Sequence, residues 1–209
     1  ADAIQTIMTA AHDNLFHFNP GQDEASQRGR GKQVRTLASY VLGCDDGSYA
    51  RPQACDGYLA AIFHPTDGED AEPFTAIIGM RAHLDDAAKP KLARLDDCHF
   101  YIVPGEMLSL SHFVREDIGG RYVTPLKSLN NLLKKEFGAE SIEKYDKKKA
   151  YLCRLYGAVR GKREAVSERE AMGAARAFSR FMAYKPVKSI NDFVAGEILE
   201  SKDLGEAIR

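Results

Sequence analysis

Two Gly-Lys pairs are the places where the sequence comes closest to nucleotide chemistry. A phosphate-binding loop needs a glycine, four further residues and then Gly-Lys-Ser/Thr, because backbone amides must surround the phosphates while the lysine reaches them. Gly31-Lys32 has Ser26 in the position of the first glycine, and Gly161-Lys162 has Tyr156 there. Neither pair is therefore a phosphate loop. The sequence also holds no Walker B carboxylate pair and no Leu-Ser-Gly-Gly signature, so it contains no complete ATPase site.

The densest early group of positive charges lies in and just after a polar, glycine-containing stretch, residues 19–33. Guanidinium groups on such a loop can bind the phosphates of a nucleotide or of DNA. Ordinary solvated surface charge remains the alternative interpretation. The group consists of Arg28, Arg30, Lys32 and Arg35.

A second basic run has tyrosines between its charges and extends from a predicted helix into the segment after it. One interpretation is contact with a nucleic-acid backbone. The other is a solvated helix face whose apolar side is formed by Tyr151, Leu152 and Leu155. The run comprises Lys144, Lys147, Lys148, Lys149, Arg154, Arg160, Lys162 and Arg163.

No other group of residues predicts a catalytic or metal centre. His83 with Asp85 and Asp86 could be drawn as metal ligands, but the local pattern is that of a strand end and a turn. Asp146-x-Lys148 is similar to part of a nuclease core, yet it falls in a predicted helix. The four cysteines form no Cys-x-x-Cys pair, so a zinc site and a disulfide framework are both weak interpretations. We assign no catalytic residue and no metal ligand.

Composition sets only broad limits. The chain has 209 residues, 44% of them hydrophobic and 28% charged, with a formal net charge of -1. Such values are typical of a globular protein, and the charge balance requires neither a nucleic acid nor a membrane as partner. Spanning a bilayer takes about 20 consecutive apolar residues, and no run approaches that length. We expect a soluble, cytoplasmic protein without a membrane partner.

The elements that must position these residues begin with a helix. Ile4, Ile7, Met8, Ala11 and Leu15 recur at helical spacing, with Asp2 as a cap or first-turn acid. The amphipathic pattern starts at once, without a leader segment. We therefore expect the chain to be part of a longer protein.

Strands and then helices follow. A short helix is expected over residues 34–42, and strands over 58–63, 74–83 and 99–103, the first two forming an antiparallel pair. Helices are expected from residue 125 onwards, over 125–133, 141–156, 167–184 and 186–199. This order predicts an α+β fold, with central antiparallel strands flanked by helices and a C-terminal helical block. We divide it into residues 1–124 and 125–209.

Several segments carry a resemblance to a known family. Asp2–Met8 resembles the helix that directly follows Gly-Lys-Ser/Thr in SMC-like and related ABC-type ATPases. Phe18–Pro20 and Arg35–Gly43 follow it as they do in the MukB-like condensin ATPases, and in particular in the JetC subunits of Wadjet-type (MksF-like) systems. The resemblance continues at Tyr58–Ala82 and, near the end of the chain, over residues 178–181 and 186–194.

The resemblance implies the N-terminal part of an ATPase head, inactive alone. The phosphate loop would lie upstream of the sequence, and the coiled coil, Walker B and signature motifs downstream. The whole protein would use ATP and Mg and would act in chromosome organisation and segregation or in plasmid defence. Its partners would be DNA, a kleisin, small winged-helix subunits and a second SMC-like head in the nucleoid.

The resemblance also implies roles for particular residues. The loop from Arg28 to Arg35, with Arg30 and Lys32, would lie close to nucleotide or DNA phosphates. The helix that contains Asp2 and Gln5 would point its N-terminal end towards the nucleotide phosphates.

Two other functions remain open. One is a non-enzymatic DNA-associated or protein-interaction domain whose first helix only imitates the family. The other is a hydrolase or nuclease that uses His83, Asp85 or Asp146. The fragment of an ATPase head would expose apolar surface where its missing half belongs, and we expect it to be able to self-associate.

Overall fold

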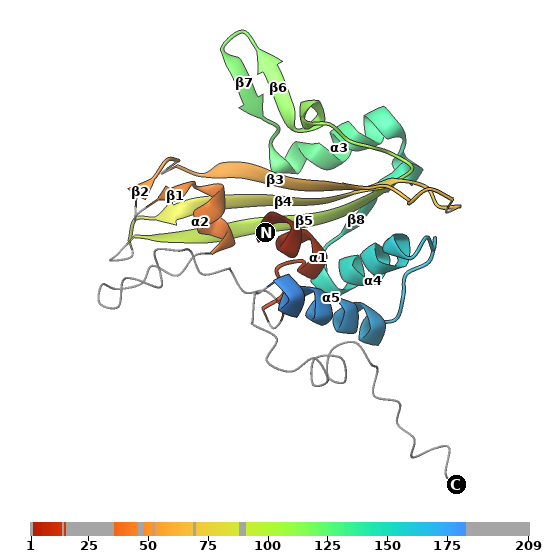
Figure 1. Cartoon of the computed structure of the whole chain (residues 1–209). Helices are drawn as coiled ribbons and strands as arrows, with labels where there is room; N and C mark the ends of the chain where they lie inside the picture. Colours follow the sequence, from red (N-terminus) through yellow and green to blue (C-terminus); the bar gives the residue numbers. More distant parts are fainter. Residues whose placement is uncertain are drawn as a thin grey trace.

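The computed structural model describes residues 2–13, 15, 36–45, 48–51, 53–68, 70–87 and 91–182. Their centre is a four-stranded sheet in the order β3-β4-β5-β8, with every neighbouring pair antiparallel. Helices cover both of its faces (Figure 1). The strands are β3 (Cys55–Phe63), β4 (Phe74–Asp85), β5 (Leu92–Pro104) and β8 (Glu143–Tyr145).

The predicted antiparallel pair is confirmed. β3 and β4 are in register from Cys55 opposite Ala82 to Phe63 opposite Phe74. The third predicted strand is also present, and it begins seven residues earlier than expected because β4 and β5 continue as a long hairpin beyond His99. Buried apolar residues on both faces make β4 the centre of the fold.

The face of the sheet that is turned downwards in Figure 1, which we call the lower face, is covered mainly by three helices, with α2 (Leu37–Val41) beyond them. The three helices are α1 (Asp2–Thr9), α4 (Lys148–Val159) and α5 (Glu168–Met182). Their apolar residues and those of the lower face form one buried cluster. It comprises Ile7, Met8, Ala10, Leu15, Phe74, Ala76, Ile78, Met80, Phe100, Ile102, Tyr151, Leu152, Leu155, Tyr156, Ala171 and Ala175.

The opposite, upper face is covered by α3 (Leu126–Phe137) and the short 3-10 helix η2 (Leu110–Phe113). Gly79 of β4 allows α3 to approach closely, because a Cβ atom there would lie 2.4 Å from Leu126 Cδ1. The upper cluster comprises Ile77, Tyr101, Val103, Leu108, Phe113, Leu129, Leu133 and Ile142.

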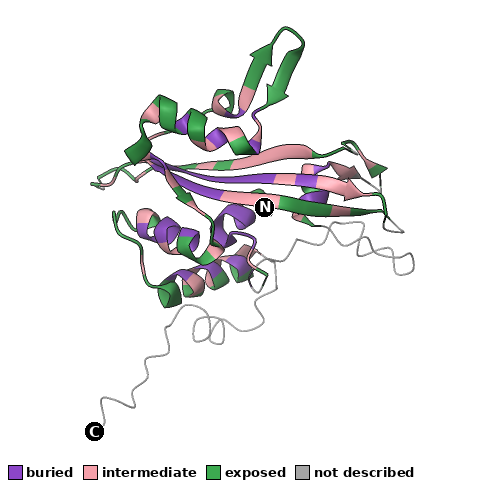
Figure 2. Ribbon diagram, turned by 180° about the vertical axis from the view of Figure 1, so that it is seen from behind, coloured by how far each residue is buried: buried purple, intermediate pink, exposed green. Residues whose placement is uncertain are grey.

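Smaller elements lie around this core. Helix α2 (Leu37–Val41) begins with a capping box between Thr36 and Ser39. β1 (Cys44–Asp45) pairs with β2 (Ser48–Tyr49). A hairpin of β6 (Val114–Asp117) and β7 (Gly120–Val123) projects from the upper face, and Figure 2 shows that it is almost wholly exposed. Neither small hairpin was predicted.

The helix predicted over residues 141–156 is wrong in its first half. Residues 139–141 form the 3-10 helix η3 (Ala139–Ser141), β8 follows, and α4 begins only at Lys148. Glu and Lys favour helices intrinsically, but the open edge of β5 recruits this segment as a strand. Tertiary pairing therefore overrides the local preference.

The predicted N-terminal helix is also too long. α1 ends at Thr9, and Ala10 and Ala11 adopt left-handed backbone conformations with φ of 52° and 45°. Leu15 is nevertheless buried, so the apolar spacing correctly predicted a core residue beyond the end of the helix. The helix predicted over 186–199 lies outside the described residues.

The α+β class with a C-terminal pair of helices is confirmed. α5 starts as predicted, with a reciprocal capping box in which Glu170 N donates to Ser167 Oγ and Ser167 N donates to Glu170 Oε2. The division at residue 124 stays a prediction. Described residues from both sides of it belong to the lower cluster.

Candidate functional site

The N-terminal end of α1 is the place where the sequence predicts phosphate binding. Ala3 is exposed and Asp2 is half-buried, whereas every residue from Gln5 to Thr9 is buried. Helix α2 lies next to this end, and Tyr40 OH donates a hydrogen bond to Asp2 Oδ2. Two segments that are 38 residues apart in the sequence are thus joined at one surface.

The other end of α1 is fixed by two tyrosines of α4. Tyr151 OH donates to the Ile7 carbonyl at 3.2 Å, and Tyr156 OH donates to the Met8 carbonyl at 3.0 Å. Burial raises the pKa of both phenols far above the ordinary value, so both remain protonated donors. The last carbonyls of a helix lack partners within it, and these hydroxyls supply them.

Gln5 lies inside the molecule and does not face the N-terminal end of its helix. It is fully buried, and its Nε2 donates to Ser179 Oγ of α5 at 3.3 Å. Ser179 Oγ in turn donates to the Leu15 carbonyl. Gln5 Oε1 has no hydrogen-bond partner among the described residues. The position of Gln5 is therefore that of a connector between α1 and α5.

The predicted basic loop cannot be placed at this site. Arg28, Arg30, Lys32 and Arg35 all lie outside the described residues. Their contact with phosphates stays a prediction that rests on sequence alone. Of the predicted site residues, Asp2 is thus the one that the structure places at the N-terminal end of α1.

The second basic run is largely paired with acidic groups of the same chain. Lys144 lies near Asp146, Lys149 pairs with Glu168, and Lys148 Nζ donates to the Ala11 carbonyl at 2.8 Å. Tyr151, Leu152 and Leu155 are buried, which agrees with the interpretation as a helix with an apolar side. The remaining pairs are Arg154 with Glu143, Arg160 with Glu170, and Arg163 with Glu72.

Gly161-Lys162, a near match to a phosphate loop, is the end of α4. Gly161 has φ of +69°, Lys162 N donates to the Gly157 carbonyl at 2.9 Å, and Gly161 N donates to the Ala158 carbonyl at 2.9 Å. These two backbone hydrogen bonds, around a glycine in the left-handed conformation, form a Schellman motif. The glycine therefore serves to end a helix.

The histidine and the two aspartates that the sequence offered as metal ligands pair with neighbours on the β4–β5 hairpin. His83 Nδ1 lies 2.6 Å from Asp96, Asp85 lies 2.7 Å from Arg94, and Asp86 lies 2.7 Å from Lys91. Asp146 directly follows β8, so its predicted helical position is wrong. Within the described ranges, no group of three or more His, Cys, Asp or Glu side chains could hold a metal ion.

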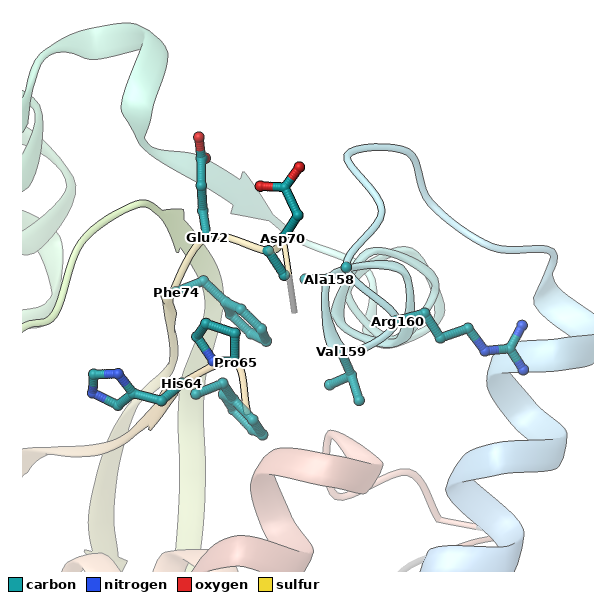
Figure 3. A pocket seen from close by; sticks show the side chains of 11 residues that line it. His64, Pro65, Asp70, Glu72, Phe74, Ala158, Val159 and Arg160 are labelled. Atoms are coloured by element: carbon teal, nitrogen blue, oxygen red, sulfur yellow. The ribbon is translucent and has the colours of Figure 1, made fainter. Parts of the chain in front are cut away.

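Sequence reasoning missed a pocket of about 420 Å³ between the β3–β4 turn and the end of α4. Figure 3 shows Phe74, Pro65 and Val159 around it, with Asp70 and Glu72 on one rim. The sequence signal that could have indicated this pocket is a phenylalanine on each side of the turn. Phe63 and Phe74 are directly opposite each other in the strand pair.

No protein-family description, curated protein or solved structure matches this chain. In the part of the chain that the structure describes, no helix combines the length and the apolar character that a membrane crossing requires. The four cysteines are free thiols. Any function must therefore be argued from the resemblance of the sequence and from the geometry of α1, its neighbours and the pocket.

Proposed function

We propose that this chain is the N-terminal part of an SMC-like ATPase head from a DNA-organising or anti-plasmid defence complex. In the whole protein, ATP and Mg would bind at the N-terminal end of α1, and DNA, a kleisin, small winged-helix subunits and a second head would be partners. The chain alone is not an active ATPase, because its sequence lacks the phosphate loop and the motifs for hydrolysis.

The observation that carries the proposal is the contact between Tyr40 and Asp2. Asp2–Met8 and Arg35–Gly43 are two of the segments that resemble the family, and they are far apart in the sequence. The hydrogen bond from Tyr40 OH to Asp2 joins these two segments. A chance resemblance in unrelated segments would not require them to be neighbours.

The physics of α1 agrees with this role. Free backbone N–H groups and the helix dipole make the N-terminal end of a helix favourable for anions. The first turn lies at the surface, while the remaining turn is held rigidly by the lower cluster and by Tyr151 and Tyr156. A phosphate loop directly preceding Asp2 would therefore lead into a fixed helix.

The outer edges of the sheet favour association with further structure. β3 is an outermost strand, and β5 pairs with β8 only through Phe100 to Ile102. Ile62 of β3 and Leu92 and Leu95 of β5 are 45%, 44% and 40% exposed. Unpaired edges with apolar side chains can recruit another chain, which supports the expected self-association of this fragment.

The upstream coding sequence provides the first test. We expect Gly-x-x-x-x-Gly-Lys-Ser/Thr to be encoded within a few residues before Asp2. The chain extended to include that loop should then bind ATP with Mg, and replacing its lysine by alanine should abolish binding. The 209-residue chain alone should bind ATP only weakly.

The opposite result is equally clear. A start codon at this point, or upstream sequence without a phosphate loop, would exclude the ATPase head. Tight Mg-dependent binding of ATP by the 209-residue chain would also contradict the proposal, since the lysine and amides that hold the phosphates are absent. An interaction domain would then be the better account.

A further inference from the structure

The pocket at the β3–β4 turn has an apolar floor. The rings of Phe63 and Phe74 stack with centroids 4.6 Å apart and an angle of 6° between their planes. Val159, which is 45% exposed, and Ala158 of α4 line the facing side. A large apolar side chain can therefore be buried between the sheet and α4.

The rim of the pocket carries negative charge. Asp70 and Glu72 lie on the β3–β4 side, and Asp67 precedes them on the same turn. Arg163 approaches Glu72 at 3.4 Å, but both side chains are largely exposed, at 88% and 66%. Asp67 and Asp70 form no ion pair with any described residue.

Arg160, the arginine among the described lining residues, points away from the opening. Arg160 extends towards α5 in Figure 3, and its Nη1 lies 3.0 Å from Glu170 Oε1. Its charge is thus already engaged outside the pocket. Glu72 thus has Arg163 nearby, whereas Asp67 and Asp70 are paired with no described cation, and a cation on a binding partner would complement their charge.

The two walls are held in fixed positions. Gly157 lets the α4–α5 loop pass close to α4, since a Cβ atom there would lie 2.2 Å from the Glu164 carbonyl oxygen. A Cβ atom on Gly161 would lie 3.4 Å from Ala71 Cβ, so the loop also touches the β3–β4 turn. Val166 N donates to the Cys153 carbonyl at 3.0 Å. A pocket formed in advance lowers the entropy loss on binding.

We propose that this pocket docks a segment of a partner protein in which an apolar side chain stands next to a lysine or arginine. The apolar side chain enters between Phe63, Phe74 and Val159, and the cation lies against Asp70 and Glu72. The proposal does not depend on nucleotide binding and concerns the end of the sheet away from the β4–β5 hairpin.

A protein side chain suits the pocket better than a free metabolite. Sites for small polar molecules hold several convergent polar groups that are themselves buried. In this pocket the floor is apolar, and the carboxylates are on the exposed rim. An apolar anchor surrounded by a charged rim is the usual composition of a protein–protein hot spot.

The test is a nuclear magnetic resonance titration of the 209-residue chain with two capped dipeptides, N-acetyl-Phe-Arg-amide and N-acetyl-Phe-Glu-amide. We expect saturable shifts of the backbone amides around Phe63, Asp70 and Val159 with the arginine peptide. The glutamate peptide should bind roughly tenfold more weakly, because it meets the acidic rim with a like charge.

Variants make the assignment specific. Asp70→Asn with Glu72→Gln should remove most of the preference for the arginine peptide, and Val159→Glu should abolish binding by placing a charge on the wall that faces the Phe63 and Phe74 rings. The matched control is Asp86→Asn with Glu116→Gln, two exposed carboxylates elsewhere on the chain, and it should leave binding unchanged.

Three results with the dipeptides would overturn the proposal. They are the absence of saturable shifts at this pocket, equal affinity for both peptides, and retained preference in the Asp70→Asn, Glu72→Gln variant. Benzylamine, a free amine with one aromatic ring, is the remaining comparison. If it bound as tightly as the arginine peptide, the pocket would be a site for small amines and the docking proposal would be wrong.

Discussion

The two faces of the sheet hold their helices by different means. On the lower face, α1 is fixed by hydrogen bonds from Tyr151 and Tyr156 to its last carbonyls, in addition to apolar packing. On the upper face, α3 relies mainly on close approach, since it lies over Gly79. Hydrogen bonds, which are directional, fix the position of a short helix, whereas close packing of complementary surfaces is sufficient for a longer amphipathic one.

The largest expected effect on stability comes from breaking a buried ion pair, and it is compared with the effect of breaking an exposed one. Arg154 is 8% exposed, and its Nε lies 2.8 Å from Glu143 Oε2, which joins α4 to β8. Arg154→Met should lower the free energy of unfolding by about 3 kcal/mol, because it leaves the partly buried Glu143 carboxylate without its cation. Urea unfolding measures this loss.

The control for that variant is Arg163→Met. Its pair with Glu72 is largely exposed, so the free energy of unfolding should change by less than about 1 kcal/mol. Equal losses in both variants would show that burial does not decide the strength of these pairs.

The next largest effect on stability tests the close approach of α3 to Gly79 on the upper face. Gly79→Ala should lower stability by about 2 kcal/mol, because the new methyl group would overlap Leu126, which is 2% exposed and has little room to move. Gly173→Ala is the matched control on α5, where no atom lies within 4 Å of the new Cβ. It should raise stability by about 0.5 to 1 kcal/mol through helix propensity. An undiminished free energy of unfolding in Gly79→Ala would contradict the dependence of α3 on close approach.

A smaller effect tests the directional bonds of the lower face. Tyr151→Phe keeps the ring but leaves the Ile7 carbonyl without its donor, so stability should fall by about 1 kcal/mol. Tyr122→Phe, on the exposed β7 strand, is the control and should be neutral. Thermal unfolding of the two variants side by side gives the difference, and equal midpoints would contradict the proposed fixing of α1.

The smallest effect is a loss of stability that occurs only in alkali. Burial, with the charges of Asp97 and Asp146, raises the pKa of Tyr101 from 10.0 to about 12. The unfolded chain therefore loses this proton first, so the stability that Tyr101 contributes is present below pH 10 and is lost as the pH rises through 12. Tyr101→Phe should be less sensitive to alkali than the parent chain in thermal unfolding at increasing pH. The same alkaline loss in both proteins would exclude Tyr101 as its source.

These comparisons also show what sequence could predict. Strong periodicity identified β3, β4, α3 and α5, because each is a segment whose own amphipathic or apolar pattern indicates its type. It failed at β8, where a Glu- and Lys-containing segment becomes a strand only through the distant edge of β5. The β6–β7 hairpin left a signal in Gly119-Gly120, a turn dipeptide between Val114 and Tyr122.

The candidate site was predictable only in part. The helical spacing around Ile4 and Ile7 located α1, but nothing in that spacing shows that Gln5 would be buried against Ser179. Such a contact joins residues 174 positions apart, and a pattern within one segment carries no information about it. For the same reason the pocket at the β3–β4 turn was missed, because its second wall comes from α4.

The long separation between Gln5 and Ser179 has a consequence for biosynthesis. An isolated helix of eight residues is unstable in water, so α1 gains its structure from the surfaces that bury it. Two of these surfaces, α4 and α5, are made of residues 148 to 182 and leave the ribosome last among the described elements. Among the described helices, the first to be translated is therefore one of the last to become stable, and until then its apolar residues are available to chaperones.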